Sequence, residues 1–500
     1  MSEFAMLSEV KSSLSDHVTN AFYIDGKWIR PEGTQRFTLV SPATDVAWLS
    51  VPLASNAEID LAIAAARRAF DDGPWPRMSG EERGVILRAL ANEIRNRLPL
   101  LAKLWTAQVG APYAFTQRLV KAGQDRFDFF AHQAETYHFE VERKTLNGAA
   151  RVRREPVGVA ALIAPWNATF PIVSHKIAAA LAAGCTMIVK SPVECPLDAL
   201  MIAECAHAVG LPPGVLNVLT ADQQGSARLV QSTGVDKISF TGSVDVGVSI
   251  ANVATQRMAR TTLELGGKSA AILLEDVDLP EALASLCPFT MPFSGQICFA
   301  QTRILVPQTR AQEMIDAFAA RVSNFKVGDP WREDTQMGPL LNQRQYDRVT
   351  GFIRQGVEGG ATLVTGGSRA EGFSAGHFLA PTVFSNVQPG MAIAQQEIFG
   401  PVVSILTYRT EQEAVQIANG TAYGLSGSVF CSDVERAYSV ACQLRTGHVG
   451  VNGLELSPVA PFGGYKMSGI GREGGREGLE AFLECKSIMM PFDPSQRSPF

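Results

Sequence analysis

Apolar runs of strand length alternate with helical segments through the middle of the chain. The strand-like runs cover residues 157–164, 185–189, 215–219 and 237–240. The helical segments between them cover residues 173–183, 197–209 and 226–232. Because the strand-like runs are apolar at nearly every position, they are typical of parallel strands that are buried on both faces. The pattern predicts an α/β fold whose ligands bind beyond the carboxyl ends of the strands.

Amphipathic and extended segments precede this region. Asp25-Gly26 is a favoured two-residue turn and predicts a hairpin over residues 21–29. Ser79 and Glu82 form a capping-box pattern that starts a helix extending to about residue 104. Helical spacing of apolar residues predicts two more helices, at 56–70 and 113–137. Residues 144–154 alternate in polarity, which indicates an extended ribbon outside the main core.

A second alternation of strands and helices occupies the other half of the chain. Its predicted strands cover residues 270–274, 303–307, 402–408, 426–430 and 448–451. The glycine-rich segment 358–367 predicts turns around one further strand. This half therefore predicts an α/β domain of its own. Residues 486–490 form a closing strand, and a tail rich in Pro and Ser follows it.

Composition narrows the class of protein. The chain has 500 residues, 46% of them apolar, and a net charge of −5, which together predict two or three ordinary globular domains. No basic run predicts binding to nucleic acid, and no uninterrupted apolar stretch predicts a membrane span. Residues 1–20 contain three acidic residues and do not resemble a secretory signal. The eight cysteines are scattered without Cys-x-x-Cys pairs, which predicts no metal site, no disulfide framework and a cytoplasmic location.

Two residues stand out as candidates for chemistry. Cys298 follows the turn-forming residues Ser294, Gly295 and Gln296, so its thiol is expected on a loop. Glu264 lies between two leucines, where a carboxylate loses hydration and is usually paired or functional. A thiol nucleophile with a separate half-buried acid indicates covalent catalysis assisted by a base.

Six segments together resemble the signature set of the NAD(P)-dependent aldehyde dehydrogenase superfamily, in the order and spacing of that family. They are Pro-Trp-Asn at 165–167, Phe-Thr-Gly-Ser at 240–243, Leu-Glu-Leu-Gly-Gly-Lys at 263–268, Gly-Gln-Ile-Cys at 295–298, Glu-Ile-Phe-Gly-Pro-Val at 397–402 and Pro-Phe-Gly-Gly-Tyr-Lys at 461–466. The resemblance extends from about residue 21 to residue 490. One such segment is weak evidence, whereas six in register are strong evidence.

The resemblance implies a fold and a division into domains. A Rossmann-type parallel-sheet domain that binds the dinucleotide is expected over residues 1–138 and 157–266. An α/β catalytic domain is expected over residues 267–465. A small β-ribbon for oligomerisation, with the C-terminal tail, is expected over residues 139–156 and 466–500. Exposed ribbon edges favour pairing with another subunit, so a homodimer or homotetramer is expected.

The resemblance also implies a mechanism. Cys298 would attack the aldehyde and form a thiohemiacetal, and hydride loss would leave a thioester. The side-chain amide of Asn167 and the Cys298 backbone N–H would stabilise the oxyanion. Glu264 would activate the water that releases the carboxylic acid. Lys176 matches a lysine associated with proton relay, although a solvated helix face is an alternative for it.

The expected dinucleotide site lacks the Gly-x-Gly-x-x-Gly pattern that is common between a strand and a helix in such sites. Residues 242–247 follow a strand and open a helix, so the helix N-terminus can still bind a pyrophosphate. The resemblance assigns these residues to cofactor binding: Ile163, Ala164, Pro165, Trp166, Lys190, Phe240, Thr241, Gly242, Ser243, Gly247, Leu265, Glu397 and Phe399. NAD is the favoured cofactor. Val193 stands where many NAD-preferring members have an acid, which leaves NADP open, unless Glu194 takes that role.

The expected substrate pocket is apolar. Its predicted wall comprises Phe170, Phe293, Ile297 and Phe299, with Pro292 nearby and Glu455 and Leu456 at the entrance. No arginine lies near Ile297, Phe299 or the entrance loop in the sequence. This pattern favours an apolar aliphatic, aromatic or terpenoid aldehyde over a semialdehyde acid, unless other loops supply an anchor for a carboxylate.

Three rival functions fit parts of the sequence. A CoA-acylating or semialdehyde dehydrogenase of the same superfamily is one alternative, but CoA-acylating members typically lack the base that Glu264 supplies. A non-enzymatic structural protein on this fold is disfavoured because Cys298 is present. A cysteine protease would leave the nucleotide-binding segments unexplained.

Overall fold

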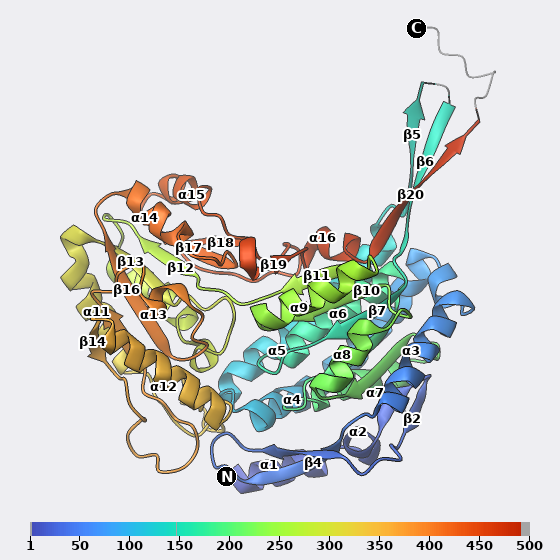
Figure 1. The fold of residues 1–500 in the computed structure, drawn as a ribbon, viewed down its shortest axis with the longest axis horizontal. Helices are drawn as coiled ribbons and strands as arrows, with labels where there is room; N and C mark the ends of the chain where they lie inside the picture. The colour runs from blue at the N-terminus through green and yellow to red at the C-terminus, as the bar shows by residue number, and fades with distance from the viewer. Residues whose placement is uncertain (1–2, 147, 492–500) are drawn as a thin grey trace.

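The computed structural model describes residues 3–146 and 148–491, whose strands form two large sheets and two small ones. The two large sheets lie side by side, each with helices packed around it, and a narrow ribbon projects from the first domain (Figure 1). The predicted α/β class, with two sheet-containing domains and a ribbon, is confirmed. No helix among the described residues is both long enough and apolar enough to cross a membrane.

An eight-stranded sheet forms the centre of the first domain, in the order β19-β11-β10-β7-β8-β9-β1-β2. Its strands are β1 (Phe22–Ile24), β2 (Lys27–Ile29), β7 (Val159–Ile163), β8 (Thr186–Ser191), β9 (Leu216–Thr220), β10 (Lys237–Thr241), β11 (Arg260–Glu264) and β19 (Gly469–Ile470). Strands β11, β10, β7, β8 and β9 run parallel, as their apolar sequences predict. Strand β11 was not predicted, because its first three residues are polar.

Helices cover both faces of this sheet. One face carries α4 (Gly80–Val109), α5 (Tyr113–Thr136), α6 (Thr169–Ala183) and α7 (Leu197–Ala208), and the other carries α3 (Asn56–Asp71), α8 (Gln223–Gln231) and α9 (Val244–Gln256). Ala160 and Leu162 of β7 pack on the first face, whereas Val159 and Ala161 pack on the second. The nearly unbroken apolar character of the strands therefore reflects burial on both sides.

Two helix boundaries differ from the sequence prediction. Helix α4 begins with the predicted Ser79–Glu82 capping box but continues past residue 104 to Val109, where Gly110 adopts a left-handed conformation with φ 75°. Helix α6 begins at Thr169 rather than residue 173, because the buried carboxylate of Asp198 accepts the Phe170 N–H at 3.0 Å. A hydrogen bond from a first-turn amide to a distant side chain is invisible in the local sequence.

The N-terminal segment adds elements that the sequence did not predict. These are α1 (Glu3–Ser12), α2 (Asp16–Asn20) and the two-stranded sheet of β3 (Arg36–Val40) and β4 (Ala47–Pro52). Leu7 and Val10 of α1 are buried in the same core as helix α4. The N-terminal residues therefore belong to the first domain.

A seven-stranded sheet forms the second domain, in the order β14-β15-β16-β13-β12-β17-β18. Its strands are β12 (Ala270–Leu273), β13 (Arg303–Pro307), β14 (Thr362–Thr365), β15 (Thr382–Ser385), β16 (Val402–Tyr408), β17 (Ser426–Phe430) and β18 (His448–Val451). Its helices are α10 (Leu279–Leu286), α11 (Ala311–Ser323), α12 (Gln343–Glu358), α13 (Ala392–Gln395), α14 (Glu411–Asn419) and α15 (Val434–Ala441). All pairings are parallel except β14 with β15.

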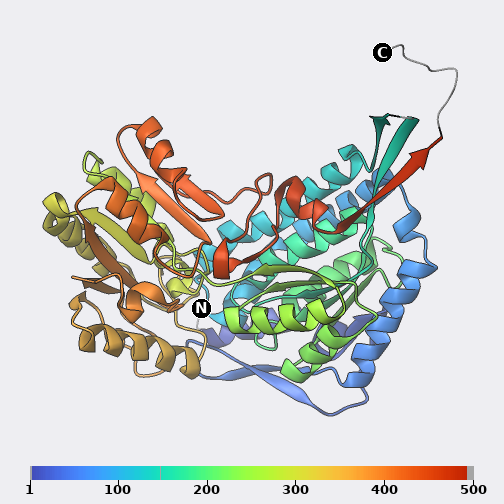
Figure 2. The ribbon, with the colours of Figure 1, turned by 45° about the horizontal axis from the view of Figure 1, so that its top comes forward.

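The ribbon consists of β5 (Glu140–Thr145), β6 (Gly148–Pro156) and β20 (Leu483–Met490), with β6 in the middle. It leaves the first domain on the side away from the second sheet (Figure 2). Every residue of β5 is exposed. The predicted closing strand at 486–490 is thus the end of β20, and the Pro/Ser-rich tail at 492–500 lies outside the described residues.

Residues 466–500 were predicted to belong with the ribbon, but their first part packs on the first domain. Strand β19 pairs with β11 at the edge of the first sheet, and α16 (Gly475–Glu480) packs on α5 and α6. Gly469 approaches β11 so closely that a Cβ atom there would overlap the Leu263 carbonyl oxygen. The segment before β20 therefore belongs to the first domain, and it lies directly beside Glu264, which pairs with Gly469.

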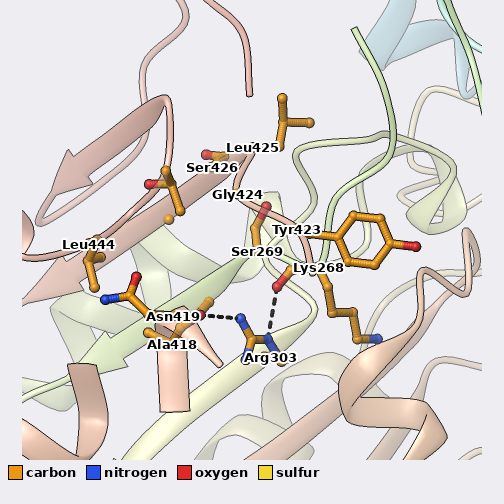
Figure 3. Close-up of a pocket in the computed structure, with 13 residues that line it drawn as sticks. Lys268, Ser269, Arg303, Ala418, Asn419, Tyr423, Gly424, Leu425, Ser426 and Leu444 are labelled. Carbon is orange, nitrogen blue, oxygen red and sulfur yellow. Dashed lines mark hydrogen bonds between the residues drawn. The ribbon is translucent and has the colours of Figure 1, made fainter. Parts of the chain in front are cut away.

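Arg303, at the start of β13, fastens the segment that follows β11. Its guanidinium donates to the Lys268 carbonyl oxygen at 2.8 Å and to that of Ala418 at 2.7 Å (Figure 3). It also donates to the Ile417 carbonyl oxygen at 2.8 Å. The last two carbonyls lie at the C-terminal end of α14, where helical carbonyls lack partners in the helix itself. One buried arginine thus hydrogen-bonds both to the segment that connects the two large sheets and to a helix of the second domain.

We expect Arg303→Met to lower the apparent melting temperature clearly. The Lys268 and Ala418 carbonyls would each lose the hydrogen bond from Arg303, at a cost of roughly 1–3 kcal/mol for each group, whereas the Ile417 carbonyl would keep the Gly420 N–H. Differential scanning fluorimetry measures the shift. Arg332→Met is the matched control, since Arg332 pairs with Asp334 at the surface, and an equal shift in both variants would contradict the role of Arg303.

Candidate active site

The loop before Cys298 holds three successive residues in the left-handed region. Phe293, Ser294 and Gly295 have φ values of 47°, 57° and 74°. This conformation costs roughly 1–2 kcal/mol for a residue with a side chain, so the surrounding structure must hold it in place. Gly295 also lies so close to Gly400 that a Cβ atom would overlap its carbonyl oxygen.

Gln296 and Asn167 provide much of the support for this loop. The fully buried Gln296 accepts the Leu341 N–H at 2.9 Å through Oε1, and its Nε2 donates to the Phe293 carbonyl at 3.3 Å. Asn167 donates from Nδ2 to the Gln296 carbonyl at 2.8 Å. The predicted oxyanion donor is therefore fixed against the loop that carries the thiol. The sequence prediction missed the role of Gln296, for which a turn-forming residue beside Cys298 was the only signal.

Cys298 is partly exposed, whereas five other cysteines are buried and Cys442 and Cys485 are exposed. Burial of its sulfur raises the pKa of the Cys298 thiol far above the ordinary value, and the carboxylates of Glu397 and Glu264 raise it further. The thiol is therefore neutral at pH 7 in this state and must lose its proton as it attacks. Among residues 3–146 and 148–491, no group of three His, Cys, Asp or Glu side chains could hold a metal ion.

The double glycine after Glu264 allows three chain segments to meet. A Cβ atom on Gly266 would overlap the carboxylate of Glu397, and one on Gly267 would lie 2.5 Å from the Cys298 carbonyl oxygen. The Gly267 N–H also donates to Glu397 Oε1 at 3.0 Å. Only residues without side chains permit this approach, which brings the predicted base and the thiol together.

Glu264 is 3% exposed, and neither oxygen of its carboxylate has a hydrogen-bond partner among the described residues. Burial and the nearby Glu473 carboxylate raise its pKa well above the ordinary value, while the charges of Lys176 and Arg472 oppose the shift. A carboxylate in such surroundings is a stronger base than one in water. Its position and its proton affinity both suit the role that the sequence predicts.

Lys176 is buried and paired, so the alternative of a solvated helix face is wrong. Its ammonium group forms an ion pair with Glu473 and donates to Ser239 at 2.9 Å. His175 Nδ1 lies 3.9 Å from the same Glu473 carboxylate. A chain of ionisable groups thus leads from Glu264 through Glu473 to Lys176. Glu473 was missed in the sequence, where a glutamate in a glycine-rich stretch was the only signal.

Cys298, Glu264 and Asn167 all line one cavity with a volume of about 510 Å³. That size is suited to a small organic ligand. Ile297, Phe299 and Pro292 line the cavity where the sequence places them, and the loop containing Glu455 and Leu456 borders it. The thiol, the base and the amide therefore face a common space that could hold a substrate.

Two residues that were predicted to line the substrate pocket are buried elsewhere in the structure. Phe170 is fully buried in the core of the first domain, beside Gly123 of α5. Phe293 is also buried, with its ring centre 6.4 Å from that of Trp166. Helix α6 directs Ile172 and His175 into the cavity instead, because they lie on a different side of the helix from Phe170.

Helix α5 forms one wall of the cavity, a contribution that the sequence prediction missed. It contributes Phe115, Arg118, Leu119, Ala122 and Arg126, which share one helical face. The alternative that another segment supplies a cation is therefore open, since α5 brings two arginines to the cavity. The spacing of the two arginines was visible in the sequence, but nothing indicated that this face of the helix would meet the loop of Cys298.

The carboxyl ends of four parallel strands line up where the dinucleotide site was predicted. Their register pairs Ile163 with Lys190 and with Phe240, and Thr241 with Glu264. The buried hydroxyl groups of Thr241 and Ser191 have no partner among the described residues. Unpartnered buried hydroxyls at this edge fit a polar ligand such as a nucleotide.

Helix α9 begins at Val244, immediately after Gly242 and Ser243. Ser243 occupies the N-cap position but makes no side-chain hydrogen bond there, so the positive end of the helix is open to an anion. Gly247 lies against Leu265, with no room for a Cβ atom. These features fit the pyrophosphate of a dinucleotide.

Aromatic rings and a buried lysine complete the predicted cofactor edge. Trp166, which follows Ala164 and Pro165, has its ring centre 5.5 Å from that of Phe399 in an edge-on contact. Burial lowers the pKa of Lys190 to about 8, and the charges of Glu194 and Asp222 oppose the shift. Glu194 is thus close enough to influence Lys190.

Comparisons with known proteins agree with the geometry of this site. The sequence matches the aldehyde dehydrogenase family over residues 28–488. It is 43% identical to the 3-succinoylsemialdehyde-pyridine dehydrogenase of a Pseudomonas species over 94% of this chain and 98% of the relative. It is 41% identical to the geranial dehydrogenase of Castellaniella defragrans, with the same two coverages. A mutant of aldehyde dehydrogenase C from Pseudomonas syringae, solved with NAD+ and octanal, is 39% identical and has a TM-score of 0.92 over 96% of this chain and 98% of that one.

We expect alkylation of Cys298 by iodoacetamide to be slow at pH 7 and to accelerate continuously up to about pH 10. The raised pKa of the thiol keeps the thiolate fraction small until the solution is alkaline, and each pKa unit changes that fraction about tenfold. Mass spectrometry of tryptic peptides follows the rate, with the exposed Cys442 and Cys485 as internal controls. Glu397→Gln should accelerate alkylation, whereas a plateau below pH 8 would contradict the predicted shift.

Proposed function

Because the chain belongs to the aldehyde dehydrogenase family, we propose that it oxidises an aldehyde to its carboxylic acid with NAD+ through a covalent intermediate on Cys298. One observation carries the proposal. The Cys298 thiol and the unpartnered carboxylate of Glu264 line the same cavity, and the Asn167 amide lines it with them. Nucleophile, base and oxyanion donor are thus grouped around one space.

The first step adds the thiol to the aldehyde. A bond forms between the Cys298 sulfur and the carbonyl carbon, the thiol proton passes to water in the cavity, and the carbon–oxygen π bond breaks so that the oxygen gains the negative charge. The Asn167 side chain, held against the Gln296 carbonyl, is positioned to stabilise that oxygen together with the Cys298 N–H. NAD+, when bound, supplies the acceptor for the hydride that leaves the tetrahedral carbon. A thioester on Cys298 remains.

The second step hydrolyses the thioester. Glu264 takes a proton from water, the resulting hydroxyl attacks the thioester carbon, and the carbon–sulfur bond breaks to release the acid. The elevated pKa of Glu264 favours this proton transfer. We assign to Glu473 and Lys176 the path along which the proton then leaves the cavity, since both lie buried beside the base. Turnover should therefore rise with pH as Glu264 becomes ionised.

The cofactor residues predicted from the sequence fit a dinucleotide. The open N-terminus of α9 would hold the pyrophosphate, Lys190 an adenosine ribose, and Glu397 the nicotinamide ribose. We favour NAD over NADP because Glu194 lies near Lys190 and its charge would repel a 2′-phosphate. The Pseudomonas syringae relative, which was solved with NAD+, supports this assignment.

The carbon skeleton of the substrate is proposed to be apolar. Ile172, Leu119, Phe289 and Phe299 line the cavity, so an alkyl chain or a ring would be removed from water there. The relatives named for geranial and solved with octanal support an aldehyde of this kind. A CoA-acylating reaction is the second candidate, and assays with and without CoA distinguish the two, since hydrolysis through Glu264 needs no CoA.

We expect Glu264→Gln to retain the first burst of NADH and to lower steady turnover by about 100-fold or more, because only hydrolysis needs the base. Stopped-flow absorbance at 340 nm with hexanal separates the burst from the steady rate. Cys298→Ala is the control and should abolish dehydrogenase and esterase activity together. A full steady rate in Glu264→Gln would show that another group activates the water.

The ribbon is proposed to join subunits into a homodimer or homotetramer. It carries exposed apolar residues, including Val141 and Ile488 at 38% each and Met489 at 65%, on strands with an open edge. We expect Ile488→Glu to reduce the mass measured by light scattering after gel filtration. Val434→Glu, on an exposed site of α15, is the matched control, and an unchanged mass in Ile488→Glu would contradict the role of the ribbon.

A further inference from the structure

Arg126 lines the cavity, and two nitrogens of its guanidinium have no acceptor among the described residues. It lies on the face of α5 that forms one wall, two turns beyond Arg118. Its Nε and Nη1 atoms are buried, and neither has a hydrogen-bond partner among the described residues. A buried guanidinium without acceptors is costly, so this arrangement calls for a ligand group that accepts hydrogen bonds.

No ion pair neutralises Arg126 among the described residues. Of the two carboxylates that favour its charged form, Glu473 has the larger effect and is already engaged in an ion pair with Lys176, and Asp125 has the smaller effect. Burial lowers the pKa of His175 well below its ordinary value, so this residue of the same wall is neutral at pH 7. Its Nε2 atom also has no partner among the described residues. This part of the cavity therefore contains a buried guanidinium that no ion pair neutralises and an imidazole nitrogen, and both lack a hydrogen-bond partner among the described residues.

The other carboxylates of the cavity do not neutralise Arg126. The raised pKa of Glu264 favours its protonated, uncharged form before reaction. Glu455 lies at the entrance, on an exposed loop. An anionic group on the ligand would restore the balance of charge, and a carboxylate matches the planar fork of a guanidinium with two parallel hydrogen bonds.

We propose that Arg126 binds a carboxylate at the far end of the substrate, so that the preferred substrates are aldehydes that carry an acid on an apolar chain. The inference rests on the proposed aldehyde oxidation and specifies its substrate class. The apolar residues of the cavity contact the chain, the aldehyde reaches Cys298, and Arg126 selects the length that places both ends correctly. Arg126 is then a specificity-determining residue, and His175 donates or accepts a hydrogen bond beside it.

The test compares ω-oxo acids of increasing chain length with their methyl esters and with the matching alkanals. We expect the wild type to prefer the best oxo acid over its ester by about tenfold or more in kcat/KM, the scale of a charge-assisted hydrogen bond. Arg126→Met should remove this preference mainly through KM and leave kcat/KM for hexanal within about threefold. Arg126→Lys, which keeps the charge, should retain part of the preference.

Arg118→Met is the matched control, because Arg118 lies on the same face of α5 but is exposed. Equal turnover of acid and ester by the wild type would overturn the proposal and indicate a neutral acceptor. A parallel loss for hexanal and the oxo acid in Arg126→Met would also overturn it, since that result indicates a structural role. An equal loss of preference in Arg118→Met would reject Arg126 as the anchor.

Calorimetry with the dicarboxylate product distinguishes this proposal from the proposed function itself. The dicarboxylate should bind the wild type at least about tenfold more tightly than Arg126→Met does. If no aldehyde were oxidised, the proposed function would fail, and the binding comparison would still decide for or against the carboxylate anchor. Equal binding of the dicarboxylate to both proteins would overturn the anchor even if aldehydes were oxidised.

Discussion

The close passage of Gly266 and Gly267 between Glu397 and Cys298 is the constraint on which the site depends. The base ends a strand of the first sheet, whereas the thiol follows a loop of the second domain. They can share a cavity only because the chain between them has no side chains at the point of closest approach. Arg303 holds the continuation of this segment against α14, so the connection between the domains is fixed at both ends.

Removal of water determines how the ionisable groups of the cavity behave. Burial favours the neutral forms of the Cys298 thiol and the Glu264 carboxyl. In the proposed mechanism the thiol therefore loses its proton as it attacks, and Glu264 must be ionised before it can take a proton from water. Lys176 and Glu473 tolerate the same buried surroundings because they form an ion pair, whereas Arg126 forms no ion pair with any residue that the structure describes. Of these two buried cations, the paired Lys176 suits the proposed proton path, and the unpaired Arg126 suits the proposed binding of a substrate carboxylate.

Much of the fold could be predicted because its signals are local. The capping box at Ser79 and Glu82, the turn at Asp25-Gly26 and the apolar runs of the parallel strands each depend on a few neighbouring residues. Predictions failed where a distant group determined the outcome. Helix α6 begins early because Asp198 accepts a hydrogen bond from an amide in the first turn of that helix. The polar strand β11 is held by its neighbours β10 and β19.

The sequence by itself determined which chemical groups are available and which of them are close along the chain. It identified Cys298, Glu264 and Asn167 through motifs whose residue types suit a thiol-based oxidation. Only the tertiary structure decided which other side chains reach the cavity. It buried Phe170 and brought Arg126 from α5 and Glu473 from near the C-terminus to the cavity that Cys298 lines. The physical reason is that the rotation of a helix about its axis and the docking of one domain on another depend on packing across the whole molecule, which no local pattern records.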